Sequence, residues 1–221
     1  VVVEILQWPQ ARRNAEGRII EVLGHKNDPG TDILSIVRKF QLPEEFSAEV
    51  LQAAEKIPAA ISAKEYRKRR DLRLLPMVTM DGEDAKDLDD AVSLEMLADG
   101  CYRLGVHIAD VGYYVQEGGI LDQEAFKRAT SVYLVDRVIP MLPPRLSNGI
   151  CSLNPQEDRL SMSCMMEIDP RGEIVQHEIF PSVIKVDERM TYTPVRQILE
   201  DRTPELLARY GPFVETFHRM R

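Results

Sequence analysis

Four aspartates fall within ten residues of this 221-residue chain: Asp81, Asp87, Asp89 and Asp90, in the stretch VTMDGEDAKDLDDAVSL. Two carboxylates about 5 Å apart repel each other by roughly 3 kcal/mol at an effective dielectric near 20. Protonation relieves such repulsion, and so does a divalent cation placed among the carboxylates. Oxygen ligands of this kind suit hard cations such as Mg²⁺ and Mn²⁺. The cluster therefore indicates a metal site.

A calcium loop, a solvated acidic turn and a set of Asx-turns each account for the aspartates less well. A calcium loop starting at Asp81 needs Gly at its sixth position and Glu at its twelfth, where this chain has Lys86 and Val92. A solvated acidic turn is not expected between the apolar runs 75–78 and 91–94, and Asx-turns explain one or two aspartates, not four. A two-metal site explains the whole set, since two ions about 3.5–4 Å apart can activate a water and clamp a phosphate.

The composition permits a folded core and argues against a simple nucleic-acid-coating protein. Hydrophobic residues make up 44% of the chain and the formal net charge is −8 at pH 7, whereas a coating protein has a basic excess. One basic run directly precedes the aspartates: Lys64, Arg67, Lys68, Arg69, Arg70 and Arg73. A solvated helix face and a phosphate-binding surface both remain open for this run.

The cysteines and the ends of the chain suggest where the protein works. Cys101, Cys151 and Cys164 lack the spacing of a zinc site or a disulfide frame, so we expect buried thiols in a reducing compartment. The sequence has no apolar run of membrane-span length and no signal peptide. We therefore expect a cytoplasmic protein, a monomer without membrane contact. Because Val1 already lies in a strand-like run, we also expect a piece of a longer chain.

Short elements are expected to position the aspartates. Two β-branched runs, residues 1–6 and 18–23, predict strands that need further strands to be stable. A helix should follow with Asp28 or Thr31 as its cap, and a second helix should begin after a Ser47 cap.

Beyond Pro76 the pattern changes to strands, and Asp89 and Asp90 should lead into the first of them. Two hairpins are predicted, one pairing residues 92–96 with 102–115 and the other pairing 160–168 with 173–182. His107 alternates within its strand and is expected to be a strand residue, not a ligand. Thr193 and Thr203 each precede a proline and predict the caps of two short helices.

Several segments together resemble one known family. TMDGEDAKDLDDAV is similar to the signature of the ribonuclease II / ribonuclease R family of 3′-to-5′ exoribonucleases. RLGVHIADVGYYV, TSVYLVDRVIPMLPPRLSNGICSLNPQEDRLSMSC and RMTYTPVRQIL follow in the family's order and approximate spacing, so the resemblance covers roughly residues 70–200 and is nearer to the ribonuclease R branch. The opening VVVEILQWPQARRNAEGRIIEVLG resembles the last strands of a cold-shock domain.

The resemblance implies an α+β fold with a mixed sheet and flanking helices, preceded by remnant strands of an OB-type cold-shock domain. It divides the chain into cold-shock strands (1–27), a helical connector or start of the nuclease domain (28–75) and the first part of an RNB catalytic domain (76–221). The family also uses a later arginine, a later glutamate and an S1-type domain, none of which can be located here. We therefore expect the chain to carry the metal-binding half of a site.

The resemblance also assigns roles. Asp81, Asp87, Asp89 and Asp90 match the family's catalytic carboxylates, which bind Mg²⁺, with Mn²⁺ as an alternative. We expect Asp81, Asp87 and Asp90 to be direct ligands, and Asp89 to be essential for the metal or for the 3′ terminal nucleotide. Tyr133 matches a tyrosine near the 3′ end of the RNA, where its ring can stack on a base. Without the resemblance, Tyr133 would be interpreted as a core residue.

The implied activity is processive, metal-dependent hydrolysis of single-stranded RNA to nucleoside 5′-monophosphates. A non-catalytic RNA-binding module, or an inactive fragment of such an enzyme, is the alternative from another class. A nuclease that cleaves DNA is a third possibility, because no residue in the sequence identifies itself as a sensor of ribose.

Overall fold

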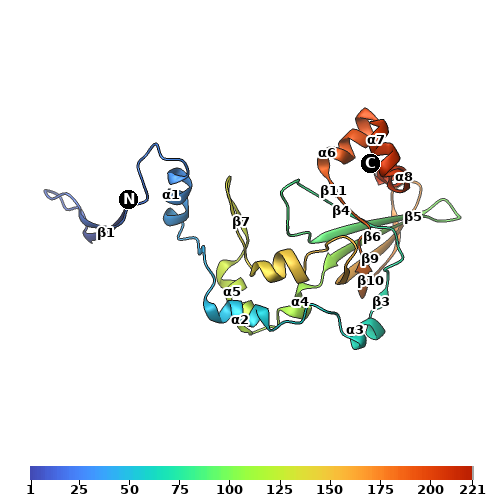
Figure 1. Cartoon of the computed structure of the whole chain (residues 1–221), viewed down its shortest axis with the longest axis horizontal. Coiled ribbons are helices and arrows are strands. Elements are labelled where there is room, and N and C mark those ends of the chain that lie inside the picture. Colours follow the sequence, from blue (N-terminus) through green and yellow to red (C-terminus); the bar gives the residue numbers. More distant parts are fainter. Residues whose placement is uncertain (221) are drawn as a thin grey trace.

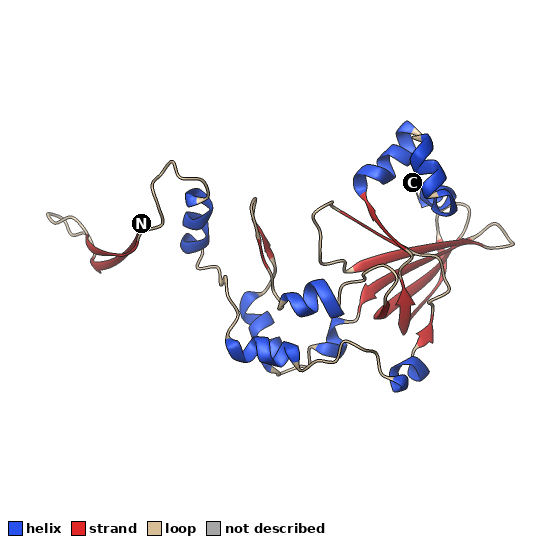
Figure 2. Cartoon of the chain, viewed as in Figure 1, coloured by secondary structure: helices blue, strands red, loops and turns tan. Residues whose placement is uncertain are grey.

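A computed structural model describes residues 1–220. Its main element is a seven-stranded sheet in the order β11-β4-β5-β6-β9-β10-β3 (Figures 1 and 2). The middle strands pair antiparallel, whereas each edge strand runs parallel to its neighbour. The strands are β3 (Arg70–Asp71), β4 (Val78–Asp81), β5 (Asp90–Met96), β6 (Tyr102–Ala109), β9 (Asp158–Ile168), β10 (Ile174–Lys185) and β11 (Glu188–Thr191). With helices packed against it, this sheet confirms the predicted α+β fold with a mixed sheet.

Both predicted hairpins are present, with one correction to their length. Strand β5 pairs with β6, and β9 pairs with β10 along most of both strands. The strand expected at residues 102–115 ends at Ala109, because Asp110 caps the short helix α4 (Val111–Tyr114). The Asp110 carboxylate accepts a hydrogen bond from the Tyr113 N–H at 3.2 Å. Aromatic and β-branched residues favour strands in isolation, and here the cap overrides that preference.

Short helices cover one face of the sheet near its β11–β4 edge (Figure 1). They are α6 (Tyr192–Arg196), the π-helix Gln197–Asp201, α7 (Pro204–Arg209) and α8 (Gly211–Met220). Their shared core with the strands contains Val78, Met190, Ile198, Tyr210 and Phe217. Helix α7 begins as predicted, after Thr203 with Pro204 in its first turn. Helix α6 begins earlier than predicted: it follows Thr191, because β11 runs directly into it and Thr193 lies inside the helix.

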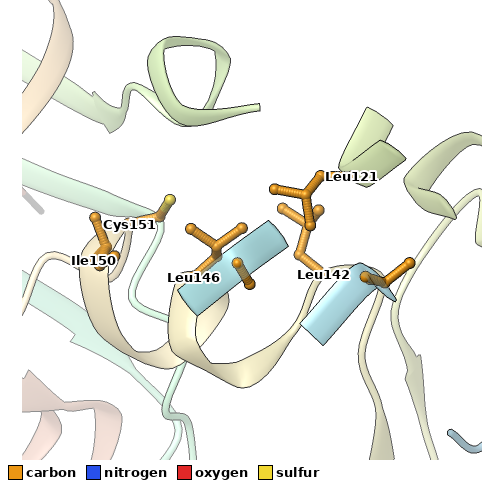
Figure 3. Close-up of a cluster of buried hydrophobic side chains, with 7 residues drawn as sticks. Leu121, Leu142, Leu146, Ile150 and Cys151 are labelled. Carbon is orange, nitrogen blue, oxygen red and sulfur yellow. The ribbon is translucent and has the colours of Figure 1, made fainter. Parts of the chain in front are cut away.

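A second group of helices lies beside the sheet and has its own core (Figures 1 and 3). It contains α2 (Ala48–Glu55), α5 (Ile120–Arg128) and the π-helix Arg145–Ile150, while α3 (Ala63–Lys68) follows α2 in the chain. The core consists of Val50, Ala54, Leu121, Leu142, Leu146, Ile150 and Cys151. Ser47 caps α2 as predicted. Helix α5 was not predicted, because Leu121 is its only buried apolar residue and the periodic pattern is therefore weak.

The first forty residues extend away from the sheet (Figure 1). The two strands predicted at residues 1–6 and 18–23 are present as β1 (Val2–Gln7) and β2 (Glu16–Glu21), which pair antiparallel and are followed by α1 (Thr31–Lys39). The predicted cap of α1 is wrong. The helix begins after Gly30, whose φ of 83° is in the left-handed region that glycine tolerates, and no side chain caps it. Asp28 instead accepts a hydrogen bond from the His25 N–H at 2.8 Å.

The cysteine prediction is correct only in part. Cys151 is buried, whereas Cys101 and Cys164 are partly accessible, and all three thiols are free. No helix among the described residues is long and apolar enough to cross a membrane.

A buried histidine links the central strands of the sheet. The two ring nitrogens of His107 lie 3.0 Å from the Ser93 hydroxyl and 2.7 Å from the Ser163 hydroxyl, and the side chain is 0% exposed. Ser161 and Ser163 both contact Ser182, so these polar contacts cross β5, β6, β9 and β10. Burial lowers the pKa of His107 to about 4. The ring is therefore neutral near pH 7, which confirms that His107 is a structural strand residue.

We expect His107 to make folding stability depend on pH. Because its folded-state pKa is about 4, below the ordinary value of 6.5, its contribution is complete above pH 6.5 and is lost as the pH falls towards 4. The full difference is about 3 kcal/mol. Denaturant unfolding at pH 7 and pH 4.5 should show a smaller loss of unfolding free energy in His107→Gln than in wild type. His177→Gln, at an exposed position on β10, is the control, and an equal loss in all three proteins would contradict this role.

Candidate functional site

The four predicted aspartates gather where β4 ends and β5 begins. Asp81 is the last residue of β4, Asp90 is the first residue of β5, and Asp87 and Asp89 lie in the loop between them. The two strands pair antiparallel, so the end of β4 lies beside the start of β5. The predicted entry into a strand is confirmed for Asp90, whereas Asp89 remains in the loop directly before β5.

A buried leucine anchors the loop between two of these carboxylates. Leu88 is 2% exposed. Its N–H donates to the Ser152 hydroxyl at 3.1 Å, and its carbonyl accepts from the Leu153 N–H at 2.8 Å. The Ser152 hydroxyl in turn donates to the Lys86 carbonyl at 3.0 Å. Burying the leucine of the Asp-Leu-Asp sequence therefore places the aspartates on either side of a fixed point.

The crowded negative charges raise the pKa of two aspartates. Burial, followed by the charges of Asp90 and Asp87, raises the pKa of Asp81, and the Arg189 charge opposes this rise. Burial, followed by the other three aspartates, raises the pKa of Asp89. Because the Asp89 side chain is exposed to solvent, solvent screening weakens this effect of burial on its pKa. The charged forms of these carboxylates are therefore unfavourable without a compensating cation.

One buried carboxylate oxygen of this region is suited to a metal ion. Within residues 1–220, three buried side-chain atoms have no hydrogen-bond partner: Thr79 Oγ1, Asp81 Oδ2 and Arg189 Nε. All three lie on the paired strands β4 and β11. A buried carboxylate oxygen without a donor is unfavourable and suits a cation. Among the described residues, no group of three or more acidic, histidine or cysteine side chains is arranged as a ready-made metal site. The suitability of this region for a metal therefore rests on the chemistry of its carboxylates and not on a preformed ligand cage.

The predicted tyrosine meets one of the predicted aspartates. Tyr133 lies on a small hairpin, β7 (Val132–Tyr133) and β8 (Val138–Ile139), and its hydroxyl donates a hydrogen bond to the Asp87 carboxylate. That hydrogen bond, together with burial, raises the pKa of Tyr133 to about 12. The side chain is still 63% exposed, so its ring is open to a ligand. Tyr133 is therefore a surface residue beside the aspartates and not a core residue.

The basic run before the aspartates divides into two parts. Three of its arginines form ion pairs within the chain: Arg69 with Asp110 at 2.7 Å, Arg70 with Glu178 at 2.7 Å, and Arg73 with Asp158 at 2.9 Å. The other three residues, Lys64, Arg67 and Lys68, are exposed on α3. The run thus combines internal pairing with a solvated helix face, and it does not form one free phosphate-binding surface.

Two residues that hold the site were not predicted. Ser152 fastens the loop from the segment after the π-helix, and Arg189 on β11 donates from Nη2 to the Glu83 and Ala85 carbonyls at 2.8 Å each. Both lie in the segments that carry the family resemblance, and membership of those segments was the only available signal. Neither residue type at its own position indicates a site.

Comparison with known proteins gives a family and close relatives. The chain matches the RNB domain family over residues 69–210 and the cold shock domain family over residues 1–47. Ribonuclease R of Thermotoga maritima is 53% identical over 220 residues, which is 99% of this chain and 31% of the relative. Ribonuclease R of Escherichia coli is 43% identical over 215 residues, which is 97% of this chain and 26% of the relative. The chain thus spans about a third or less of the length of these relatives.

Solved structures agree in fold. RNase R of Mycoplasma genitalium in complex with double-stranded RNA matches with a TM-score of 0.83 and 32% identity, over 91% of this chain and 36% of that chain. Yeast Ssd1, a pseudonuclease, matches with a TM-score of 0.73 over 90% of this chain and 25% of that chain, and at 22% identity this likeness shows a shared fold alone.

Proposed function

Because this chain belongs to the RNB domain family, we propose that it is the metal-binding part of a 3′-to-5′ exoribonuclease. The proposed reaction is processive hydrolysis of single-stranded RNA to nucleoside 5′-monophosphates in the cytoplasm, with Mg²⁺ as the ion. The observation that supports it most strongly is the gathering of four carboxylates at the β4–β5 junction, one with a buried oxygen that has no donor. Complexes of Mycoplasma genitalium RNase R with RNA support RNA as the substrate.

The proposal divides the chain as the sequence does: cold-shock strands over residues 1–27, a helical connector over 28–75 and the first part of the catalytic domain over 76–221. The cold shock and RNB matches support this order. The remaining parts of the site would come from outside the 221 residues, since the chain covers 31% of its Thermotoga maritima relative.

In this proposal the four aspartates and Tyr133 have different roles. Asp81, Asp87 and Asp90 hold the metal, and Asp89 serves either the metal or the 3′ terminal nucleotide. When bound, a divalent ion supplies neutralisation of the phosphate charge and activation of water. Tyr133 offers its exposed ring to the terminal base, which requires no particular base because every base has a π-face.

The main rival is a non-catalytic RNA-binding module. Yeast Ssd1, a pseudonuclease, shares the fold, so the fold alone does not establish chemistry. The retained aspartates argue against this rival, because four carboxylates weaken the binding of a phosphate chain unless a cation accompanies them.

The test uses a protein of the relatives' length that contains this chain, acting on 5′-labelled RNA and on DNA of the same sequence. With Mg²⁺ we expect progressive shortening of the RNA and release of nucleoside 5′-monophosphates, and EDTA should stop both. RNA binding without shortening would favour the non-catalytic module. Faster cleavage of DNA than of RNA would favour the DNA nuclease.

A tyrosine pair of variants tests the stacking role. Tyr133→Ala should weaken binding of the RNA 3′ end by about 5- to 150-fold, the range of one base–aromatic stack. Tyr133→Phe keeps the ring, loses the hydrogen bond to Asp87, and should bind RNA nearly as well as wild type. Fluorescence anisotropy with 5′-labelled RNA in EDTA measures both. Val135→Ala, at the 96% exposed tip of the same hairpin, is the control. Equal loss in the Phe and Ala variants would contradict stacking.

A further inference from the structure

Arg189 makes contacts to the acidic loop that the proposed reaction does not explain. It lies on β11, opposite Thr79 of the parallel strand β4. Its Nη2 donates to the carbonyls of Glu83 and Ala85 at 2.8 Å each, and the Gly82 carbonyl lies 3.4 Å away. The two hydrogens on Nη2 satisfy the two short contacts. A single guanidinium therefore holds most of the backbone turn that leaves β4.

This turn needs an external partner because of its charges. It joins Asp81 to the other aspartates, whose mutual repulsion favours an open loop. The carbonyl oxygens of this turn carry partial negative charge and, without a partner, would add to the negative charge around the aspartates. The positively charged guanidinium of Arg189 contacts three of these oxygens instead. Arginine suits this task, because its charge is permanent and its donors form a rigid fork, whereas lysine is a single flexible point charge.

We propose that Arg189 is a positioning residue that holds the loop after β4 closed, so that Asp81 and Asp87 stay together against their own repulsion. The inference rests on the proposed function in assigning those carboxylates to a metal. The hydrogen bonds of Arg189 go to the backbone carbonyls of the loop.

Trypsin cleavage after Lys86, a residue of the loop, can measure how often the loop opens. Lys86 is exposed, but its carbonyl accepts a hydrogen bond from the Ser152 hydroxyl, so we expect trypsin to cut after it faster when the loop opens. In the 221-residue chain without metal, Arg189→Met should speed cleavage after Lys86 about tenfold, as expected for loss of charge-assisted hydrogen bonds. The cleavage rate of Arg189→Lys should fall between those of Arg189→Met and wild type. Arg196→Met, which removes an exposed arginine of α6, should match wild type. Mass spectrometry identifies the cut, and far-UV circular dichroism checks that the sheet stays folded.

Mn²⁺ binding separates positioning from simple charge. Electron paramagnetic resonance of free Mn²⁺ gives the affinity. If Arg189 were only a nearby positive charge, Arg189→Met would bind Mn²⁺ more tightly and Arg189→Lys would bind like wild type. A positioning role predicts weaker binding in Arg189→Lys, although the charge is kept, and it predicts that saturating Mn²⁺ slows the cut after Lys86.

Each outcome decides a different point. Unchanged cleavage after Lys86 in a folded Arg189→Met chain would overturn the inference, and so would the pattern of a simple charge. Absence of Mn²⁺ binding in wild type would count against the proposed function, while faster cleavage after Lys86 would still establish Arg189 as the residue that closes the loop. If Arg189→Met does not fold, Arg189→Lys carries both measurements.

Discussion

In a protein of the relatives' length that contains this chain, Asp89→Asn is expected to reduce the proposed RNA hydrolysis by at least about a thousandfold while making the metal-free protein more stable. A thousandfold loss corresponds to about 4 kcal/mol of transition-state stabilisation, which is within the contribution of metal-ion catalysis. The amide keeps the size of the side chain and removes the charge that a cation and a water require. The loss should appear in kcat, measured in steady-state assays with saturating RNA and Mg²⁺.

The opposite effect on stability follows from the raised pKa of Asp89. For a carboxyl group whose folded-state pKa lies above its ordinary value, stability is complete at low pH and is lost as the pH rises through the folded-state pKa. The difference in the free energy of unfolding between Asp89→Asn and wild type should therefore appear above about pH 4 and grow as the pH rises. Mg²⁺ should reverse its sign, because the ion stabilises the folded state only where it binds.

Asp84→Asn is the matched control for both effects, since Asp84 is an exposed aspartate of the same loop. It should change neither RNA hydrolysis nor the free energy of unfolding measurably. If Asp89→Asn degrades RNA at the wild-type rate, the assignment of the site is wrong. If it loses activity and stability together, the carboxylate serves the fold and not the chemistry.

Arg128→Met is expected to destabilise the helical part of the chain by about 3 kcal/mol or more, the effect of removing one partner from a buried charged contact. The Arg128 side chain is 1% exposed. It donates to the carbonyls of Pro43, Glu45 and Pro140 at 2.7, 2.6 and 3.2 Å, and to the Glu124 carboxylate at 2.8 Å. Methionine fills part of the volume and leaves these acceptors without a donor.

The same variant should also loosen the hairpin that carries Tyr133. Pro140 follows β8 directly, and Arg128 ties it to the connector before α2. Hydrogen exchange should therefore increase around residues 132–139 as well as in α2 and α5. Lys127→Met, at the neighbouring exposed position of α5, is the control and should leave exchange unchanged. Faster exchange confined to α5 would show that Arg128 does not connect the hairpin to the helices.

Local patterns in the sequence predicted those parts of the site that neighbours in the chain create. The spacing of the four aspartates, the entry of Asp90 into β5, and the β5–β6 and β9–β10 hairpins all depend on residues within a few positions or across a short turn. The Ser47 cap was predictable for the same reason. The roles of the aspartates and of Tyr133 came from family resemblance and stay proposals.

The parts that failed depend on distant contacts or on competing signals. Ser152 reaches the acidic loop across 64 positions, and nothing near either residue indicates that contact. The basic run looked free because its carboxylate partners, such as Glu178, lie 108 positions away from Arg70. The end of β6 and the start of α6 were misplaced where two elements follow each other without a turn, so that one residue satisfies both patterns.

Strand β11 has a consequence for the order in which the site can form. Arg189 contacts the acidic loop across 104 to 107 positions, and the Asp187 carboxylate accepts from the Met77 N–H across 110. Contacts of such separation carry a large loop-closure entropy and form slowly. A ribosome also delivers the aspartates long before it delivers the strand that fastens them. A nascent chain that has not reached residue 187 therefore carries all four carboxylates in a loop that β11 cannot yet hold closed.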